Sequence, residues 1–198
     1  MIYRYLNISD LDIEKIKPLV SKERIERSEK YKHEIDRLRS VAVEYLLNET
    51  LKEYDESIST PVVLTYDEQG KPHLFTDNGE VYVSLTHSGD YVGCMVSDRP
   101  CGIDIEKHKD REYEKIARRI CTDLEIYGIE TSKKFFDLWT AKESILKAYG
   151  SGLALDMRSF EIIRSGDEFR TSVDGISYVG AIKDFVGGYS LSYAEETV

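Results

Sequence analysis

The stretch FFDLWTAKESILKAYGSGL, from Phe135 to Leu153, predicts an amphipathic helix that ends at glycine. Its apolar residues recur close to the 3.6-residue period of a helix with one buried face, and Gly150 and Gly152 provide the stop. On a helical wheel, Trp139, Glu143 and Lys147 share one side beside that apolar face. Taken alone, Glu143 and Lys147 are also consistent with an ordinary surface pair four residues apart, which stabilises a helix by about 0.2–0.5 kcal/mol.

A second acidic element lies about forty residues upstream, in Cys101-Gly102-Ile103-Asp104-Ile105-Glu106. As a strand, this segment places Ile103 and Ile105 in the core and projects Asp104 and Glu106 from the other face, with their Cα atoms about 6.5–7 Å apart. Two neighbouring carboxylates repel each other unless a positive charge lies between them. All-oxygen ligation suits Mg²⁺, so the pair is a candidate metal site. The alternative is a solvent-facing strand edge with ordinary acids.

Length and composition set limits on the class of protein. A chain of 198 residues with 41% hydrophobic content suits one large or two small domains. The net charge of −10 argues against a nucleic acid as the main partner, because duplex binding depends on lysine and arginine at the phosphates. A small phosphorylated ligand in a local basic pocket remains compatible with this charge.

Cysteine usage and hydropathy bear on the location of the protein. The three cysteines show no CxxC spacing, so neither a zinc site nor a disulfide framework is indicated, and we expect buried, reduced thiols. The N-terminal segment lacks the apolar core of a signal peptide, and no apolar run is long enough to span a membrane. We therefore expect a cytosolic protein that is not inserted in a membrane.

The rest of the chain predicts two similarly built halves that meet near residue 100. Helices are expected over 10–30 and 31–54, a hairpin over 81–96 across Ser88-Gly89-Asp90, and three short antiparallel strands in the tail from Phe160 to Tyr193. A further helix is expected within 107–120. Its basic residues form a solvated face or a surface for an acidic partner protein: Lys107, Lys109, Arg111, Lys115, Arg118 and Arg119.

The two acidic motifs, in this order and at this separation, resemble the paired signature of the 4′-phosphopantetheinyl transferase superfamily. Its first part is Gly102-Ile-Asp104-Ile-Glu106, and its second runs from Trp139 through Lys142-Glu143 and Lys147 to Gly150-Ser-Gly152-Leu153. Three further segments resemble the surfactin-synthetase-activating type: Gly70-Lys71-Pro72, Leu85-Thr86-His87-Ser88, and the arginines near Asp36-Arg37-Leu38-Arg39.

This resemblance implies a fold and an organisation. The expected fold is α+β, with two similar α/β halves related by a pseudo-twofold, each a long helix packed on a small, mainly antiparallel sheet. Residues 1–100 would bind the nucleotide of coenzyme A, residues 101–198 would carry the metal and the catalytic groups, and the active site would lie between the halves. A monomer is expected, because one chain supplies both halves.

The resemblance also implies an activity. Such enzymes move 4′-phosphopantetheine from coenzyme A to a serine of an acyl or peptidyl carrier protein, and they release adenosine 3′,5′-bisphosphate. Asp104, Glu106 and Glu143 would hold Mg²⁺, and Lys147 would reach the phosphates. Glu125 is a candidate proton acceptor, although it also fits an ordinary surface glutamate. A metal-dependent nuclease and a non-catalytic module that binds coenzyme A remain the alternative functions.

By the same resemblance, several residues of the first half would surround the nucleotide. The expected contacts to its 3′-phosphate and adenosine end are Arg24, Arg27, Arg39 and His87, and those along the nucleotide are Lys71, Thr86 and Ser88. His87 taken alone is equally consistent with a structural histidine.

Overall fold

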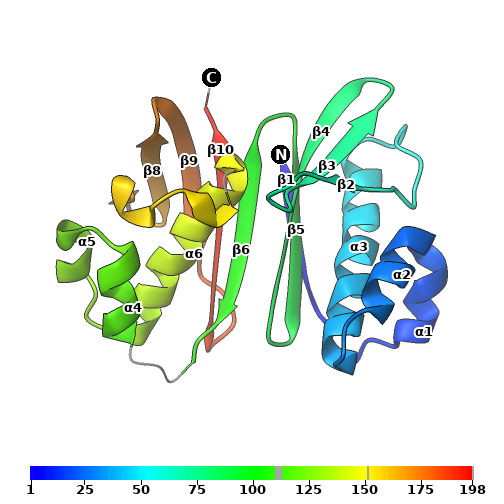
Figure 1. Cartoon of the computed structure of the whole chain (residues 1–198), viewed down its shortest axis with the longest axis horizontal. Helices are drawn as coiled ribbons and strands as arrows, with labels where there is room; N and C mark the ends of the chain where they lie inside the picture. Colours follow the sequence, from blue (N-terminus) through cyan, green and yellow to red (C-terminus); the bar gives the residue numbers. More distant parts are fainter. Residues whose placement is uncertain (110–112, 151, 198) are drawn as a thin grey trace. The chain divides into compact units, whose positions relative to one another are not determined.

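The structure is a computed structural model that describes residues 1–109, 113–150 and 152–197. The chain divides into two compact units, Met1–Asp98 and Arg99–Val198. Figure 1 shows the helices and strands of both units along the chain. Each unit is described by itself.

The first unit is a five-stranded antiparallel sheet with helices on one face. Its elements are β1 (Ile2–Asn7), α1 (Ile13–Ile16), the 3₁₀ helix η1 (Lys17–Leu19), α2 (Lys22–Glu29), α3 (Glu34–Tyr54), β2 (Thr65–Tyr66), β3 (Pro72–Thr76), β4 (Gly79–Ser88) and β5 (Tyr91–Ser97). The strand order is β1-β5-β4-β3-β2. The long helix α3 contacts β5 and β1, and its apolar stripe forms a buried core with Val83, Val92 and Val96 of the sheet.

Most of the elements expected in this unit are present. The predicted hairpin is confirmed: β4 and β5 pair antiparallel, and Ser88 lies opposite Tyr91 across the Gly89-Asp90 turn. The predicted helical region over 10–30 is divided, since a short 3₁₀ helix with Pro18 in its first turn lies between α1 and α2. Proline tolerates the first turn of a helix but interrupts the hydrogen bonding of a helix interior.

The second unit repeats the architecture of the first. Its elements are β6 (Cys101–Lys107), α4 (Tyr113–Ile120), α5 (Asp123–Tyr127), α6 (Ser132–Tyr149), η2 (Gly152–Ala154), η3 (Met157–Ser159), β7 (Ile163–Ser165), β8 (Glu168–Val173), β9 (Ile176–Lys183) and β10 (Tyr189–Glu196). The strand order, β6-β10-β9-β8-β7, equals that of the first sheet when each unit is counted from its own first strand. The predicted fold class, two similar halves with a long helix on an antiparallel sheet, is confirmed.

Two expectations about the second unit need correction. The tail forms four strands rather than three, and Phe160 and Ile162 precede β7 as buried core residues instead of forming a strand. The predicted basic helix is shorter than expected, because Lys107 belongs to β6 and the helix α4 begins at Tyr113. Arg111 lies outside the described residues.

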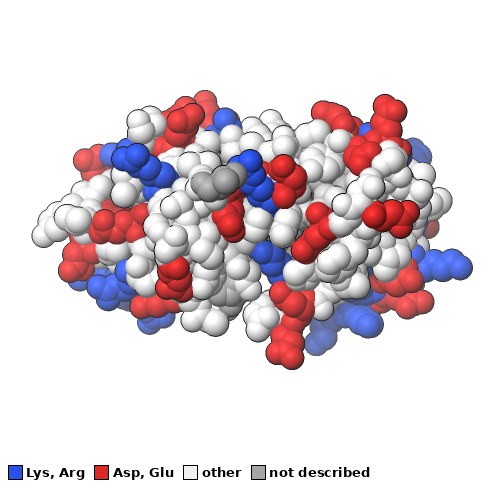
Figure 2. Space-filling model, turned by 90° about the horizontal axis from the view of Figure 1, so that it is seen from above, with Lys and Arg blue, Asp and Glu red and all other residues white. Residues whose placement is uncertain are grey.

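Burial and surface charge agree with the composition. All three cysteines are buried, and burial raises the pKa of the Cys94 and Cys121 thiols to about 12, which keeps them protonated at neutral pH. Acidic and basic side chains are interspersed among the described residues in Figure 2. Among the described residues, no helix combines the length and the apolar character needed to cross a bilayer.

Candidate active site

The acidic pair on β6 faces the long helix of the second unit. A Cβ atom added at Gly102 would lie 1.9 Å from the backbone oxygen of Ser144, so the even-numbered side of β6 packs directly on α6. Because side chains alternate along a strand, Asp104 and Glu106 lie on this same side. The prediction that the two carboxylates share a face therefore agrees with the structure. However, that face is covered by α6, and Ile103 and Ile105 are buried on the opposite face.

Local signals fix the ends of α6 and the direction of its polar side chains. The Thr131 hydroxyl accepts a hydrogen bond from the Lys134 amide and caps the first turn. Gly150 ends the helix in the left-handed conformation with φ of 87°, a conformation that glycine adopts without steric penalty. Between these caps, Glu143 and Lys147 lie one turn apart and are both partly buried.

Lys147 pairs with the strand rather than with its helical neighbour. Its Nζ atom donates to Asp104 Oδ1 at 2.7 Å and to the Ile103 carbonyl oxygen at 2.9 Å. The surface Glu143–Lys147 pair considered from the sequence is therefore not the main contact of this lysine. Instead, the ammonium joins α6 to the acidic strand.

Glu143 belongs to the same electrostatic cluster. The pKa of Glu143 is raised to about 7, mostly by burial and to a lesser degree by the charges of Asp104 and Glu106, while Lys147 opposes the shift. The three carboxylates predicted to act together are thus close enough to repel one another. Negative charge of this density needs a compensating cation, which Lys147 supplies only in part.

The donor set fits a divalent cation such as Mg²⁺, because all three side chains offer carboxylate oxygens, the ligands that this ion prefers. As the side chains lie, no three histidine, cysteine or acidic residues among those described already form a group that could hold a metal ion. Lys147 lies against Asp104 in this arrangement. Residues of the right chemistry are therefore neighbours, while their metal-binding geometry is not preformed.

In the first unit, one cavity gathers three of the predicted nucleotide contacts. The cavity has a volume of about 170 Å³, and its lining includes Arg24, Arg27, His87, Gly70 and Pro72. An adjoining hollow of about 200 Å³ shares both arginines. Two guanidinium groups and an imidazole around one cavity favour an anionic ligand.

The two arginines of this cavity are anchored differently. Arg24 is 7% exposed, and its Nε donates to Glu44 Oε2 at 2.7 Å while Nη2 donates to the Tyr66 hydroxyl at 2.6 Å. Arg27 is exposed and lies over the Tyr66 ring, with its guanidinium carbon 4.2 Å from the ring centroid. Arg24 is thus built into the fold, whereas Arg27 carries the more accessible charge.

Arg39 does not line either hollow and has a structural set of partners. Its Nε and Nη2 donate to the Gly89 carbonyl oxygen at 2.9 and 2.6 Å, and its Nη1 donates to Asp36 Oδ1 at 2.8 Å. The guanidinium therefore attaches α3 to the turn between β4 and β5. This arrangement argues against the predicted role of Arg39 at the 3′-phosphate.

The remaining predicted nucleotide contacts are divided by strand geometry. Thr86 and Ser88 are buried on the side of β4 opposite His87, which is exposed. Lys71 lies between the two cavity-lining residues Gly70 and Pro72, and its backbone amide donates to Asp67 Oδ1 at 2.8 Å. The structure thus brings His87 together with the arginines of α2, and it places Thr86 and Ser88 on a different face.

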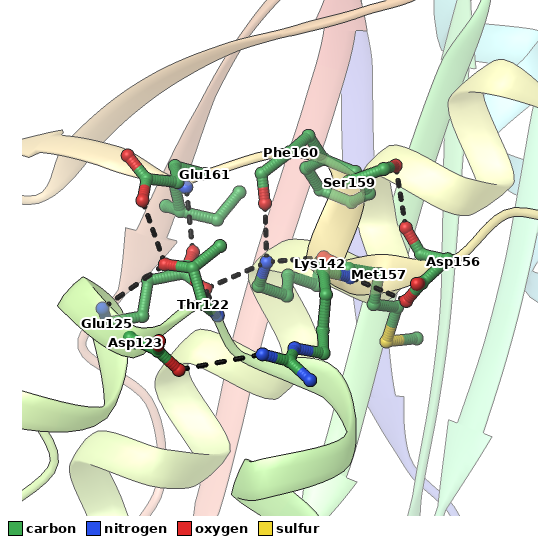
Figure 3. Close-up of polar contacts among 11 residues, drawn as sticks. Thr122, Asp123, Glu125, Lys142, Asp156, Met157, Ser159, Phe160 and Glu161 are labelled. Carbon is green, nitrogen blue, oxygen red and sulfur yellow. Dashed lines mark hydrogen bonds and ion pairs between the residues drawn. The ribbon is translucent and has the colours of Figure 1, made fainter.

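Glu125, the predicted proton acceptor, is engaged in a buried ion pair. Its side chain is 7% exposed and its Oε2 atom lies 2.9 Å from Lys142 Nζ (Figure 3). The same oxygen accepts a hydrogen bond from the Thr122 amide at 2.8 Å, and Oε1 accepts one from the Ile162 amide at 2.9 Å. Both oxygens of Glu125 already have partners within the fold, which argues against its predicted role.

Sequence reasoning missed two buried polar groups of the second unit. Lys142 has 0% exposure, and burial lowers the pKa of its ammonium while Glu125 opposes the shift. Ser190, which lies opposite Glu106 in the sheet, donates to Asp137 at 2.6 Å and contacts His108 Nε2 at 2.9 Å. A visible signal existed for Lys142, because its position belongs to the apolar stripe of α6.

Comparisons with known proteins show which family this chain resembles. A family model described as the 4′-phosphopantetheinyl transferase superfamily matches residues 100–194. The 4′-phosphopantetheinyl transferase Sfp of Bacillus subtilis (strain 168) is 29% identical over 167 residues, which cover 81% of this chain and 74% of that protein. The 4′-phosphopantetheinyl transferase psf-1 of Bacillus pumilus is 32% identical over 161 residues, which cover 78% of this chain and 68% of that protein. The 4′-phosphopantetheinyl transferase gsp of Aneurinibacillus migulanus is 31% identical over 149 residues, which cover 72% of this chain and 61% of that protein.

The chain belongs to the 4′-phosphopantetheinyl transferase superfamily. Both the predicted resemblance to the surfactin-synthetase-activating type and the predicted enzyme class are confirmed by these relatives.

Proposed function

We propose that this protein transfers 4′-phosphopantetheine from coenzyme A to a serine hydroxyl of an acyl or peptidyl carrier protein, depends on Mg²⁺, and releases adenosine 3′,5′-bisphosphate. The observation that carries the proposal is the cluster of Asp104, Glu106, Glu143 and Lys147, in which burial and, after it, the charge of Asp104 raise the pKa of Glu143 to about 7. The proposal includes a monomer, supported by the repeated strand order within one chain.

Each member of the cluster has a role that follows from its chemistry. Asp104, Glu106 and Glu143 would hold Mg²⁺, which when bound neutralises the diphosphate oxygens and stabilises the charge that develops on them. The Lys147 ammonium, now on Asp104, would donate to a phosphate oxygen of the leaving nucleotide. Movement of this one proton donor from a carboxylate to the substrate would couple substrate binding to the release of Asp104.

The nucleotide end of coenzyme A is assigned to the first unit. Its 3′-phosphate would bind in the cavity lined by Arg24, Arg27 and His87, where Arg27 presents an exposed guanidinium group. Arg27 is the stronger candidate for direct contact, because Arg24 is already committed to Glu44 and Tyr66. Thr86, Ser88 and Lys71 would contact other parts of the nucleotide.

The carrier protein is assigned to the exposed basic side chains of α4. Lys115, Arg118 and Arg119 are exposed on this helix in a chain of net charge −10. Such a cluster would attract an acidic partner and orient it.

Release of adenosine 3′,5′-bisphosphate tests the proposed reaction. The protein is incubated with coenzyme A, Mg²⁺ and an apo acyl carrier protein or an apo peptidyl carrier protein, and the nucleotide products are separated by chromatography. The proposal predicts one nucleotide released per carrier molecule, and none from a carrier whose acceptor serine is replaced by alanine. Nucleotide release that does not depend on the carrier would contradict the proposal and favour a phosphodiesterase.

A further inference from the structure

Lys142 is a fully buried lysine whose hydrogen-bonding capacity is used completely. Its ammonium offers three N–H donors, and three acceptors surround it: Glu125 Oε2 at 2.9 Å, the Met157 carbonyl oxygen at 2.7 Å and the Phe160 carbonyl oxygen at 2.7 Å. The ammonium also lies 4.6 Å from the centroid of the Phe160 ring. A buried charge is tolerated only with such a complete set of partners, because an unpaired one is strongly destabilising.

The three acceptors come from two segments, α5 and residues 156–162, which are also bound to each other. Figure 3 shows Lys142 of α6 pointing toward α5 and toward the segment 156–162 that follows the glycine end of the helix. The Thr122 hydroxyl donates to Glu161 Oε1 at 2.9 Å, and the Ile162 amide donates to Glu125 Oε1 at 2.9 Å. Asp156 caps η3 by accepting from the Arg158 amide. Lys142 therefore inserts into a connected polar network rather than into a loose pocket.

This network is linked to the acidic cluster through the backbone of α6. Lys142 and Glu143 are consecutive, so a rotation of the helix that moved one side chain would move the other. At about 6 Å from the helix axis, a carboxylate would shift by roughly 2 Å for a 20° rotation, which is enough to change a metal contact. Any such rotation would also withdraw the Lys142 ammonium from its three acceptors.

We propose that Lys142 is a positioning residue, whose buried ammonium fixes the rotation of α6 and thereby directs Glu143 toward Asp104 and Glu106. A buried ion pair is weak evidence for stability, since apolar residues of similar volume often stabilise a core equally well. What the pair adds is one defined arrangement of α6, α5 and the segment 156–162. The inference rests on the proposed function, because it gives Glu143 its role in binding the metal.

The test uses the full chain and a readout that does not need the reaction. Binding of Mn²⁺, which prefers the same oxygen ligands as Mg²⁺, is measured by the loss of the free-ion signal in electron paramagnetic resonance. The variants are Lys142→Met, Glu125→Gln and the double variant, and thermal unfolding identifies a temperature at which each is folded. Lys133→Met is the matched control. It removes a lysine of the same helix, and this lysine pairs with Asp137 rather than with Glu125.

A positioning role predicts Mn²⁺ affinity reduced at least about tenfold in Lys142→Met and in the double variant, with turnover reduced to a similar degree and the KM for coenzyme A within about twofold. The double variant removes the unpaired carboxylate, so it recovers stability without recovering Mn²⁺ affinity. Lys133→Met keeps the affinity of the unmodified protein. Folded Lys142→Met or double-variant protein with unchanged Mn²⁺ affinity and unchanged turnover would overturn the inference.

The outcomes separate this inference from the proposed function. Unmodified protein that binds Mn²⁺ but transfers nothing would refute the proposed reaction and leave the positioning test intact. If Lys142→Met and the double variant both fail to fold, Glu125→Gln carries the test, since glutamine keeps an oxygen acceptor but loses the charge. Unchanged Mn²⁺ affinity in folded Glu125→Gln would then count against the inference, and a loss of at least about threefold would support it.

Discussion

Lys147 of α6 and Asp104 of β6 form an ion pair, with Nζ 2.7 Å from Oδ1. The same ammonium donates to the Ile103 carbonyl oxygen, so it joins the helix to the acidic strand at two points. This contact places the Lys147 ammonium next to the carboxylates that would bind a metal. It gives Lys147 a defined position before any substrate arrives.

Replacing Lys147 by Met should lower turnover more than it lowers stability. The change removes the proposed phosphate donor, and removal of one such donor reduces turnover by about 10²-fold. The expected result is a fall in kcat of this order, measured at saturating coenzyme A, with the protein folded at the assay temperature. Lys134→Met serves as a control, because Lys134 lies on the same helix and its ion pair with Glu130 is exposed. Equal kcat values for Lys147→Met and Lys134→Met would show that Lys147 has a structural role and does not contact the phosphate.

The stability of the metal-free protein should depend on pH through Glu143. Its folded pKa of about 7 lies above the ordinary value of 4.5, so the folded state binds this proton more tightly than the unfolded chain does. Glu143 therefore makes its full contribution to the free energy of unfolding below about pH 4.5. This contribution, about 2–3 kcal/mol, is lost as the pH rises to about 7. Denaturation in urea with EDTA, between pH 4.5 and 8, measures this change.

Glu143→Gln isolates that contribution from other groups. His73 also has a raised pKa, because it lies between Glu80 and Asp67, and its contribution falls over part of the same range. The difference between the unmodified protein and Glu143→Gln removes the His73 contribution, since both proteins retain this residue. A difference that stays constant across the range would show that Glu143 has an ordinary pKa.

Arg27 and Arg39 should respond differently to the 3′-phosphate of coenzyme A. Arg27 is exposed at the cavity, so Arg27→Ala should weaken coenzyme A binding by about tenfold while changing the affinity for 3′-dephospho-coenzyme A little. Arg39 is bound to Gly89 and Asp36, so Arg39→Ala should weaken both ligands alike and lower the unfolding temperature. Calorimetric titration with the two ligands measures the ratio of the affinity for coenzyme A to the affinity for 3′-dephospho-coenzyme A. If Arg27→Ala leaves this ratio unchanged, Arg27 does not contact the 3′-phosphate.

Gly102 should not tolerate a side chain. A Cβ atom there would meet the Ser144 carbonyl oxygen at 1.9 Å and the Ala148 amide nitrogen at 2.8 Å, and backbone atoms cannot move aside as a flexible side chain can. We expect Gly102→Ala to destabilise the protein by about 3 kcal/mol or more, as overpacking of a rigid contact does. Gly187→Ala is the control, since no atom lies within 4 Å of its added Cβ. Similar unfolding midpoints for the two variants would contradict the close packing of β6 on α6.

Periodicity and caps were sufficient to predict the elements that carry the candidate site. The strand with Asp104 and Glu106 follows from alternation, and α6 follows from its apolar stripe and Gly150. Phe160, where the first strand of the tail was expected, lies outside the strands for a physical reason. Phe160 and Ile162 alternate because both are buried, but their backbone groups bond to the Lys142 and Glu125 side chains rather than to a neighbouring strand.

The roles of the buried charges could be predicted only in part. Thr122-Asp-Leu-Glu125 has the spacing of a capping box, and the structure confirms that Glu125 accepts from the Thr122 amide. This signal favours a structural glutamate over a catalytic one. The pairing of Arg24 with Glu44, by contrast, joins two helices through tertiary packing. No local pattern specifies which of several acids an arginine will meet.

The measurement that tests the central claim most directly is the intact mass of an apo carrier protein after incubation with this protein, coenzyme A and Mg²⁺. We predict a gain of one phosphopantetheine, about 340 Da from its covalent composition, on the acceptor serine. The gain should be absent with EDTA and strongly reduced with Glu143→Gln. A full gain of mass in EDTA, or no gain with either an acyl or a peptidyl carrier protein, would contradict the proposed Mg²⁺-dependent transfer.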